Sequence, residues 1–165
     1  MKKGILILLL ISVFLSCGIY SFTGASISKD ITSVSIENFE NNTASSPPSL
    51  GNNLTEALKD RFNDQTNLSI INTNGDLIFE GTISSYSIKP ISIRSDETAA
   101  QNRLKIGVKV KYTNQLDEEF NYHSNFSRYR DYDSNANLSQ IEDQLMEEII
   151  EELVDDIFNK ALANW

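Results

Sequence analysis

Residues that commonly carry catalysis are sparse in this chain of 165 residues, which has a single histidine, His123, and a single cysteine, Cys17. His123 lies in a predicted strand, without a second histidine for a metal site and without a nucleophile motif beside it. A catalytic site needs several groups that converge in the right geometry, so a surface histidine is the simpler interpretation. The sequence therefore predicts no catalytic residue, no metal site and no cofactor. An enzyme that pairs His123 with an acid stays open as an alternative.

Acidic residues are abundant, and eight of them lie between Glu142 and Asp156 with no basic residue among them. Such a run could attract divalent cations, but it is far more often a solvated face. We therefore expect these carboxylates to face solvent rather than to form acid–base pairs.

Basic residues gather on one face of a single predicted strand. Apolar and polar residues alternate over positions 103–113, as in a strand with one buried face. The polar face of this strand carries a row of bases roughly 26 Å long. The row consists of Arg103, Lys105, Lys109 and Lys111.

Two further bases, Lys89 and Arg94, precede the loop at 95–102 and extend this basic region at one end of a hairpin. We interpret the six residues as candidate ligand-binding residues for an anionic ligand or a membrane surface. The alternative is a solvent-facing sheet whose lysines pair with Glu80 or Glu118 on adjoining strands.

Residues 1–16 have the pattern of an export signal, with a basic head at Lys2 and Lys3 and an apolar run at 5–15. This run is shorter than the roughly 18–20 residues that cross hydrocarbon, so we predict a signal peptide rather than a membrane helix. Cys17 follows at the position where a bacterial lipobox places its cysteine. We predict lipid attachment at Cys17. The alternative is an ordinary small residue near a cleavage site.

The remaining residues, 17–165, have the length of one domain, and the chain is 40% hydrophobic, enough for a single core. They contain 23 acidic and 12 basic residues, because Lys2 and Lys3 are removed, which gives a net charge of −11. A domain this acidic is not a general binder of nucleic acid. Because the only cysteine is assigned to lipid, the domain must be stable without a disulfide.

The first half of the domain shows a strand, a helix and two more strands. Val34 and Ile36 share one face of a strand that ends at a polar loop, 40–49, and a short amphipathic helix begins near Leu50. Residues 68–71 and 77–88 are predicted strands, joined as a hairpin by a turn at Asn74-Gly75. Their alternation slips near Ser84-Ser85, which predicts a β-bulge.

The second half continues with an antiparallel strand and a long helix. After a turn at 114–119, Phe120, Tyr122 and Phe126 resume the alternation, and Tyr129 and Tyr132 are expected in an aromatic loop. A helix of about 25 residues follows, capped by Asn137 or by Ser139. Its apolar residues come in pairs with a period of four, so the apolar stripe rotates by about 40° per repeat.

This order of elements contains no alternating βαβ units. It predicts an α+β fold, a two-layer sandwich in which two helices pack on one face of a mainly antiparallel sheet of about four strands.

Short segments with a specific order and spacing run through the whole of the predicted domain. They are CGIYSFTG at 17–24, LTEALKDRF at 54–62, GDL at 75–77 with FEG at 79–81, NRL at 102–104 with VKV at 108–110, FSRY at 126–129 and DIFNKA at 156–161. In this arrangement the chain resembles the LptE family of lipopolysaccharide-transport lipoproteins, in the form found in Bacteroidota.

The resemblance implies a non-enzymatic role. Proteins of this family plug the β-barrel protein LptD, assist its assembly, and bind lipopolysaccharide on its way to the outer leaflet. It also implies acyl chains, palmitate among them, on Cys17. The expected location is the outer membrane, on its periplasmic side, because no acidic run follows Cys17.

Two basic positions of the family bear on the ligand. A basic residue in the loop between two central strands contributes to lipopolysaccharide binding, and Arg94 occupies the comparable place. A second basic position, just before the C-terminal helix, has no counterpart among residues 134–137. A lipoprotein with another binding or structural role, and less favourably an enzyme using His123, are the alternatives to this interpretation.

Overall fold

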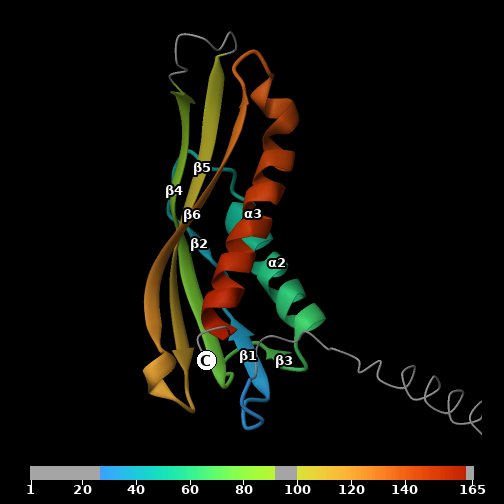
Figure 1. Cartoon of the computed structure of the whole chain (residues 1–165), viewed down its shortest axis with the longest axis vertical. Coiled ribbons are helices and arrows are strands. Elements are labelled where there is room, and N and C mark those ends of the chain that lie inside the picture. Colours follow the sequence, from blue (N-terminus) through green and yellow to red (C-terminus); the bar gives the residue numbers. More distant parts are fainter. Residues whose placement is uncertain (1–26, 92–99, 163–165) are drawn as a thin grey trace, which may run out of the picture.

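A computed structural model describes residues 27–91 and 100–162 of the chain. These residues form two layers, a mixed sheet and two helices that cover one of its faces (Figure 1). The elements in chain order are β1 (Ser33–Ile36), β2 (Glu40–Asn41), α2 (Leu50–Gln65), β3 (Ser69–Ile71), β4 (Leu77–Ile91), β5 (Gln101–Asn114), the 3₁₀ turn η1 (Glu118–Phe120), β6 (Tyr122–Asp133) and α3 (Leu138–Leu162).

The predicted α+β sandwich is confirmed, with one correction to its sheet. The strand order is β3-β1-β4-β5-β6, and β2 pairs with β4, so the described residues form six strands rather than about four. Strand β1 pairs with β3 and with β4, and β2 pairs with β4; these three pairings are short and parallel. Strands β4, β5 and β6 form a long antiparallel meander. Strands β1 and β3 correspond to predicted strands, whereas β2 has only two residues, too few to show an alternation, and it lies in the predicted polar loop.

The meander agrees with the predicted alternation along most of its length. The β4–β5 register shifts between Ile83 and Ser85, which confirms the bulge, and both Ile83 and Tyr86 are therefore buried on the helix side. The expected aromatic loop is wrong, because Tyr129 and Tyr132 lie within β6 and pair with β5. Because the two tyrosines are three residues apart, they lie on opposite faces of β6, with Tyr129 exposed and Tyr132 buried.

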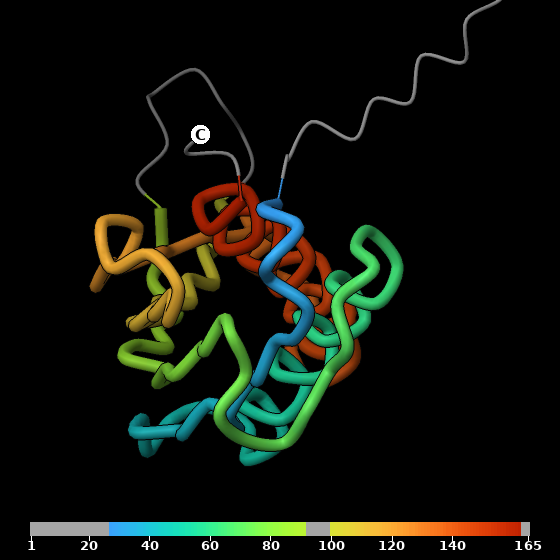
Figure 2. The backbone as a smooth tube through the Cα atoms, turned by 90° about the horizontal axis from the view of Figure 1, so that it is seen from below, coloured from blue at the N-terminus to red at the C-terminus, as the bar shows by residue number. Residues whose placement is uncertain are grey.

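The predicted hairpin between 68–71 and 77–88 is also wrong, because β1 lies between β3 and β4 and is parallel to both. The chain therefore crosses β1 at positions 72–76, as seen from below in Figure 2. It crosses on the face opposite the helices, where the Gly75 N–H donates to the Ser35 hydroxyl at 3.2 Å. A Cβ at Gly75 would lie 2.5 Å from the Ser35 backbone nitrogen, so only glycine fits this crossing.

Asp76 fastens the crossing to β1. Its carboxylate accepts hydrogen bonds from the backbone N–H and the hydroxyl of both Thr32 and Ser33, at 2.8 to 3.0 Å. These donors, the Thr32 N–H first, lower the pKa of Asp76 below its ordinary value. The bonds tie the start of β4 to the start of β1.

Helix α2 confirms the predicted amphipathic helix and packs its apolar face on the sheet and on α3. Leu50, Leu54, Leu58 and Phe62 are fully buried. The Phe62 ring lies 5.2 Å from that of Phe79 on β4 and 5.0 Å from that of Phe158 on α3. These aromatic contacts join both helices to the sheet.

Helix α3 has the predicted length of 25 residues, and Asn137 caps it by accepting from the Ser139 N–H and hydroxyl. Both members of each apolar pair are buried, from Leu145-Met146 to Ala161-Leu162. They are buried because α3 contacts α2 on one side and β5 and β6 on the other. The period of four thus produces an apolar face wide enough for two neighbours.

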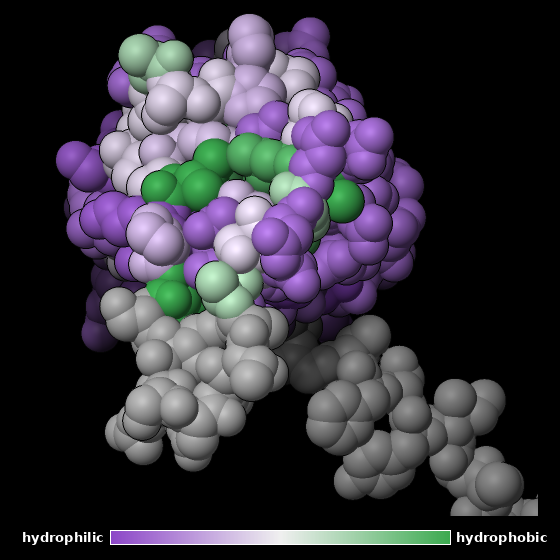
Figure 3. Space-filling view, turned by 90° about the horizontal axis from the view of Figure 1, so that it is seen from above, coloured by the Kyte–Doolittle hydropathy of each residue, from purple (hydrophilic) through white to green (hydrophobic). Residues whose placement is uncertain are grey.

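The β4–β5–β6 meander projects beyond α2, and α3 is the helix that accompanies it there (Figure 1). Seen from that end, hydrophobic groups lie in a depression within a hydrophilic surface (Figure 3). Ile88 on β4 is 40% exposed. The core is consequently less completely covered at this end than along α2.

Candidate ligand-binding face

The face of the β4–β5–β6 meander opposite the helices, called the open face below, carries the predicted row of bases. On β5 the helix side is buried at Leu104, Ile106, Val108, Val110 and Tyr112. The intervening residues point the other way, which confirms the strand with one buried face. Lys89 on β4 lies opposite Arg103, so it belongs to the same face.

Two of these bases are held by acids on the neighbouring strands. Arg103 donates two hydrogen bonds to Asp131 on β6, at 2.7 and 2.8 Å, and its guanidinium lies 3.7 Å from the Tyr129 ring centroid. The hydrogen bond to Asp131 raises the pKa of Arg103, and Arg103 in turn lowers the pKa of Asp131. Lys111 Nζ lies 2.5 Å from the Glu80 carboxylate, as the solvent-facing alternative predicted.

The other bases differ in their surroundings. Glu118, the second predicted partner, lies in η1, and no ion pair joins it to β5 in the described part of the chain. Within that part, Lys89, Lys105 and Lys109 have no ion pair either. Arg94 and Cys17 lie outside the described residues. The structure therefore brings five of the six predicted bases onto one face and leaves the sixth a prediction.

A shallow groove of about 340 Å³ crosses the open face over β4, β5 and β6. It is lined by Glu80, Gly81, Thr82, Lys109, Val110, Lys111, His123, Ser124 and Asn125. His123 thus lines a depression of the open face. Its side chain has no hydrogen-bond partner among residues 27–91 and 100–162, and Glu80 is already bound to Lys111. Among the described residues, the groove therefore lacks the acid–histidine contact on which the enzyme alternative depends.

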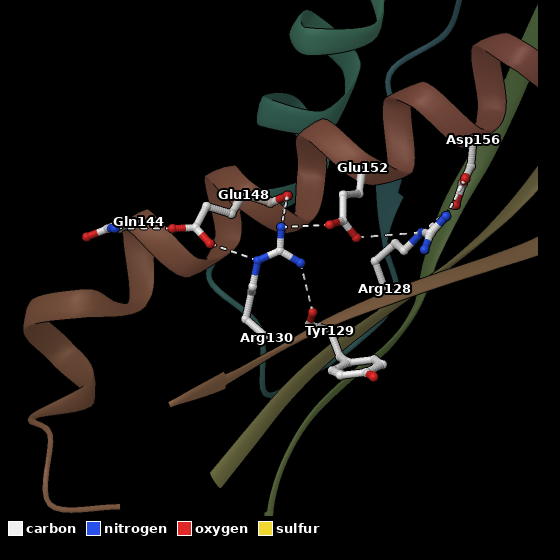
Figure 4. Close-up of polar contacts among 7 residues, drawn as sticks. All are labelled: Arg128, Tyr129, Arg130, Gln144, Glu148, Glu152 and Asp156. Carbon is white, nitrogen blue, oxygen red and sulfur yellow. Dashed lines mark hydrogen bonds and ion pairs between the residues drawn. The ribbon is translucent and has the colours of Figure 1, made fainter. Parts of the chain in front are cut away.

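The acidic run on α3 is not simply a solvated face, which corrects the expectation for Glu142–Asp156. Two arginines of β6, Arg128 and Arg130, reach across to α3 and bind a row of acids four residues apart (Figure 4). Arg128 binds Asp156 through two bonds of 2.6 Å, and Arg130 binds Glu148 at 2.7 Å.

Glu152 completes this arginine–acid network, which comprises Arg128, Arg130, Glu148, Glu152 and Asp156. Its carboxylate lies 2.8 Å from Arg130 Nη2 and 3.7 Å from Arg128 Nε. The hydrogen bonds from Arg130 lower the pKa values of Glu148 and Glu152. Sequence analysis missed the two arginines, although they share one phase of β6 with Phe126 and Tyr132.

Two more acids of α3 are bound elsewhere. Arg61 of α2 pairs with Asp155, and the Tyr86 hydroxyl of β4 lies 2.5 Å from the Glu142 carboxylate. Burial and the bond to Glu142 raise the pKa of Tyr86. Five of the eight acids are therefore bound by side chains of the same domain.

The described residues show neither a metal site nor a membrane-spanning helix. Among them no group of three histidine, cysteine or acidic side chains is placed to hold a metal ion. None of the helices described has both the length and the apolar character needed to cross a membrane.

The sequence was compared with models of protein families, and residues 31–161 match the LptE model, described as lipopolysaccharide-assembly. The match covers both helices and every strand of the described sheet. The chain belongs to the LptE family. LptE proteins are a non-enzymatic family of lipoproteins for lipopolysaccharide assembly. A search of curated proteins found no similar sequence.

Solved structures share the LptE-like fold with this chain. A minor lipoprotein from Acinetobacter baumannii is 15% identical, with a TM-score of 0.54, over 82% of this chain and 95% of that one. Rare lipoprotein B from Shewanella oneidensis is 16% identical, also with a TM-score of 0.54, over 78% and 92%. A putative neuraminyllactose-binding hemagglutinin homolog from Helicobacter pylori is 10% identical, with a TM-score of 0.53, over 86% and 88%. At these identities the likeness shows the fold alone.

Proposed function

We propose that this protein is an outer-membrane lipoprotein that plugs an LptD-type β-barrel, assists its assembly, and binds lipopolysaccharide during transport to the cell surface. The observation that carries this proposal is the family match over residues 31–161, which spans the whole layered domain. The protein acts without catalysis in this role. It needs no cofactor, and its partners are the barrel and lipopolysaccharide rather than nucleic acid.

The charges of the open face support a polar enclosure for the domain. Lys89, Lys105 and Lys109 present unpaired ammonium groups there within the described residues, and such groups are costly against lipid. The lumen of a membrane β-barrel is polar and often filled with water, so it can solvate them. A plug in such a lumen can keep this face charged.

The anchor is the second part of the proposal. Residues 1–16 direct export and are removed, and Cys17 then carries the acyl chains that hold domain 17–165 at the periplasmic side of the outer membrane. Two or more chains are needed for stable anchoring, since one chain binds a bilayer only reversibly. The ligand residues proposed are Arg94 and Lys89 with Arg103, Lys105, Lys109 and Lys111.

The partner can be tested by affinity isolation. The protein, tagged at its C-terminus, is purified from detergent-solubilised outer membranes of its own host, beside an unrelated lipoprotein with the same tag. We expect a large β-barrel protein to be recovered with this protein and not with the control. Recovery of no barrel protein would contradict the plug role and favour another binding or structural role.

A further inference from the structure

The bases of the open face differ in how they are bound, and this difference singles out Lys109. Asp131 holds Arg103, and Glu80 holds Lys111. The other three lysines have no side-chain partner in the described part of the chain. Of these three, Lys109 alone lines the groove on the open face.

Neutral hydrogen-bonding groups surround Lys109 in the groove. Thr82 on β4 and Asn125 on β6 lie directly opposite it in the same row of the sheet, and His123 lies in the next row. Residues opposite one another on neighbouring strands have Cβ atoms about 4.5–5.5 Å apart. The ammonium, hydroxyl and amide groups therefore converge over one strip of backbone. The three neutral side chains make no hydrogen bond to other side chains within residues 27–91 and 100–162.

The charge of the groove favours an anion. Glu80 is the one acid among the residues that line it, and the ammonium group of Lys111 already neutralises that carboxylate. The unpaired charge that remains is that of Lys109. Donors on three adjacent strands line the one groove, which suits an oxyanion that has several acceptor oxygens.

We infer that this groove binds a phosphate group, through Lys109 with Thr82, Asn125 and His123. A phosphate presents more acceptor oxygens than a carboxylate and can use all of these donors at once. The inference rests on the proposed function only for the source of the phosphate. That source is either the phosphorylated headgroup of a lipopolysaccharide or free phosphate.

The inference can be tested on the full lipidated protein in detergent micelles. Inorganic phosphate is titrated at constant ionic strength, with acetate in a parallel titration, and backbone amide shifts are followed by NMR. We expect saturable shifts at Thr82, Lys109 and Asn125 with phosphate. Lys109→Gln should raise the Kd about fivefold or more, as for the loss of one charge-assisted hydrogen bond at an exposed site.

Lys29→Gln is the control, because Lys29 is an exposed lysine that lies outside both the open face and the groove. This control should change the Kd by less than about twofold, since diffuse charge is screened by salt. Equal effects of the two variants, equal binding of acetate, or shifts that do not saturate would each overturn the inference. Thermal unfolding followed by circular dichroism confirms that both variants are folded.

A second titration separates the two sources, using lipopolysaccharide before and after enzymatic removal of its phosphates. Weaker binding of the dephosphorylated form, together with a defect in Lys109→Gln, assigns the groove to the lipid headgroup. Binding of phosphate without binding of either lipid supports the groove and contradicts lipopolysaccharide binding. Binding of both lipids unchanged by Lys109→Gln excludes the lipid headgroup as the ligand of the groove, leaves free phosphate as its ligand, and leaves the proposed function standing.

Discussion

Gly75 allows the chain to cross β1. Substitution by alanine, which adds one methyl group, tests whether this position tolerates a side chain. In Gly75→Ala the new Cβ would lie 2.5 Å from the Ser35 nitrogen and 2.8 Å from the Val34 carbonyl carbon, both of them backbone atoms. We expect the free energy of unfolding to fall by about 2 kcal/mol, as for an overpacked core, measured by urea denaturation.

Gly107→Ala is the matched control for this substitution. Its Cβ would lie 2.4 Å from the Ser85 hydroxyl, which is the end of a side chain that can rotate away. A much smaller loss of stability is therefore expected at Gly107. Equal losses in the two variants would contradict a specific requirement for glycine at the crossing.

Asp76 makes the stability of the protein depend on pH in the acidic range. Its pKa in the folded protein lies below the ordinary value of 3.8, so its charged form stabilises the fold above that value. This contribution is lost as the pH falls through the lowered folded pKa. Asp76→Asn should reduce the free energy of unfolding by about 1 kcal/mol near neutral pH, the usual scale for hydrogen bonds to a charged group.

The pH series provides the check on Asp76. The difference in stability between the natural protein and Asp76→Asn should be constant above about pH 5 and should shrink below about pH 4, where the unfolded carboxyl is protonated. Chemical denaturation at each pH measures it. A difference that grows as the pH falls would mean that another group is responsible.

At the scale of elements, the arginine–acid network joins β6 to α3. Glu152→Gln removes the carboxylate that both arginines share, whereas the exposed Glu151 beside it has no side-chain partner in the described residues. We expect Glu152→Gln to lower the free energy of unfolding by about 0.5–1 kcal/mol and Glu151→Gln to leave it nearly unchanged. Urea denaturation at low and at high salt measures both.

Salt distinguishes an ion-pair network from simple packing. The effect of Glu152→Gln should decrease at high salt, because the network is partly exposed and therefore screened. An effect that is independent of salt would assign the loss to packing of the Glu152 side chain instead.

Elements could be predicted where the sequence pattern lies within the element itself, but the pairing of strands far apart in the sequence could not. Alternation within one strand or helix gave β5, α2, α3 and the bulge at Ser84-Ser85, because each pattern depends on local burial. The turn signal at Asn74-Gly75 is also local, and it is typical of a hairpin. Nothing in residues 68–88 indicates that β1, some forty residues earlier, lies between the two strands.

The candidate site shows the same limit. The row of bases followed from alternation in β5 alone, but the pairing of Arg103 with Asp131 depends on the β5–β6 register. The groove around Lys109 depends in addition on short side chains of β4 and β6. For the same reason the acids of α3 could not be matched to Arg128 and Arg130 before the layers were known.

For the whole molecule, the proposed anchor gives a direct prediction. Cys17→Ala should release the protein from the membrane fraction, because the acyl chains supply the binding energy of the tether. Fractionation with immunoblotting measures this, in cells that lack the barrel partner, so that the barrel cannot retain the protein. Circular dichroism of the released protein should show the same folded domain. Unchanged retention in the membrane would contradict lipid attachment at Cys17.

The elongated β4–β5 hairpin has a consequence for where the two ends of the domain can lie. The 15 residues of β4 span about 50 Å, whereas the hydrocarbon core of a bilayer is about 30 Å thick. The start of β1 lies beside the start of β4, at the end of the sheet opposite Ile91 (Figure 1), and Ser33 is 16 residues after Cys17. With the barrel enclosure and the lipid anchor proposed above, the domain can stay tethered to the inner leaflet while Ile91, at the far end of β4, lies near the level of the outer leaflet. Neither the tether nor the domain has to move across the membrane.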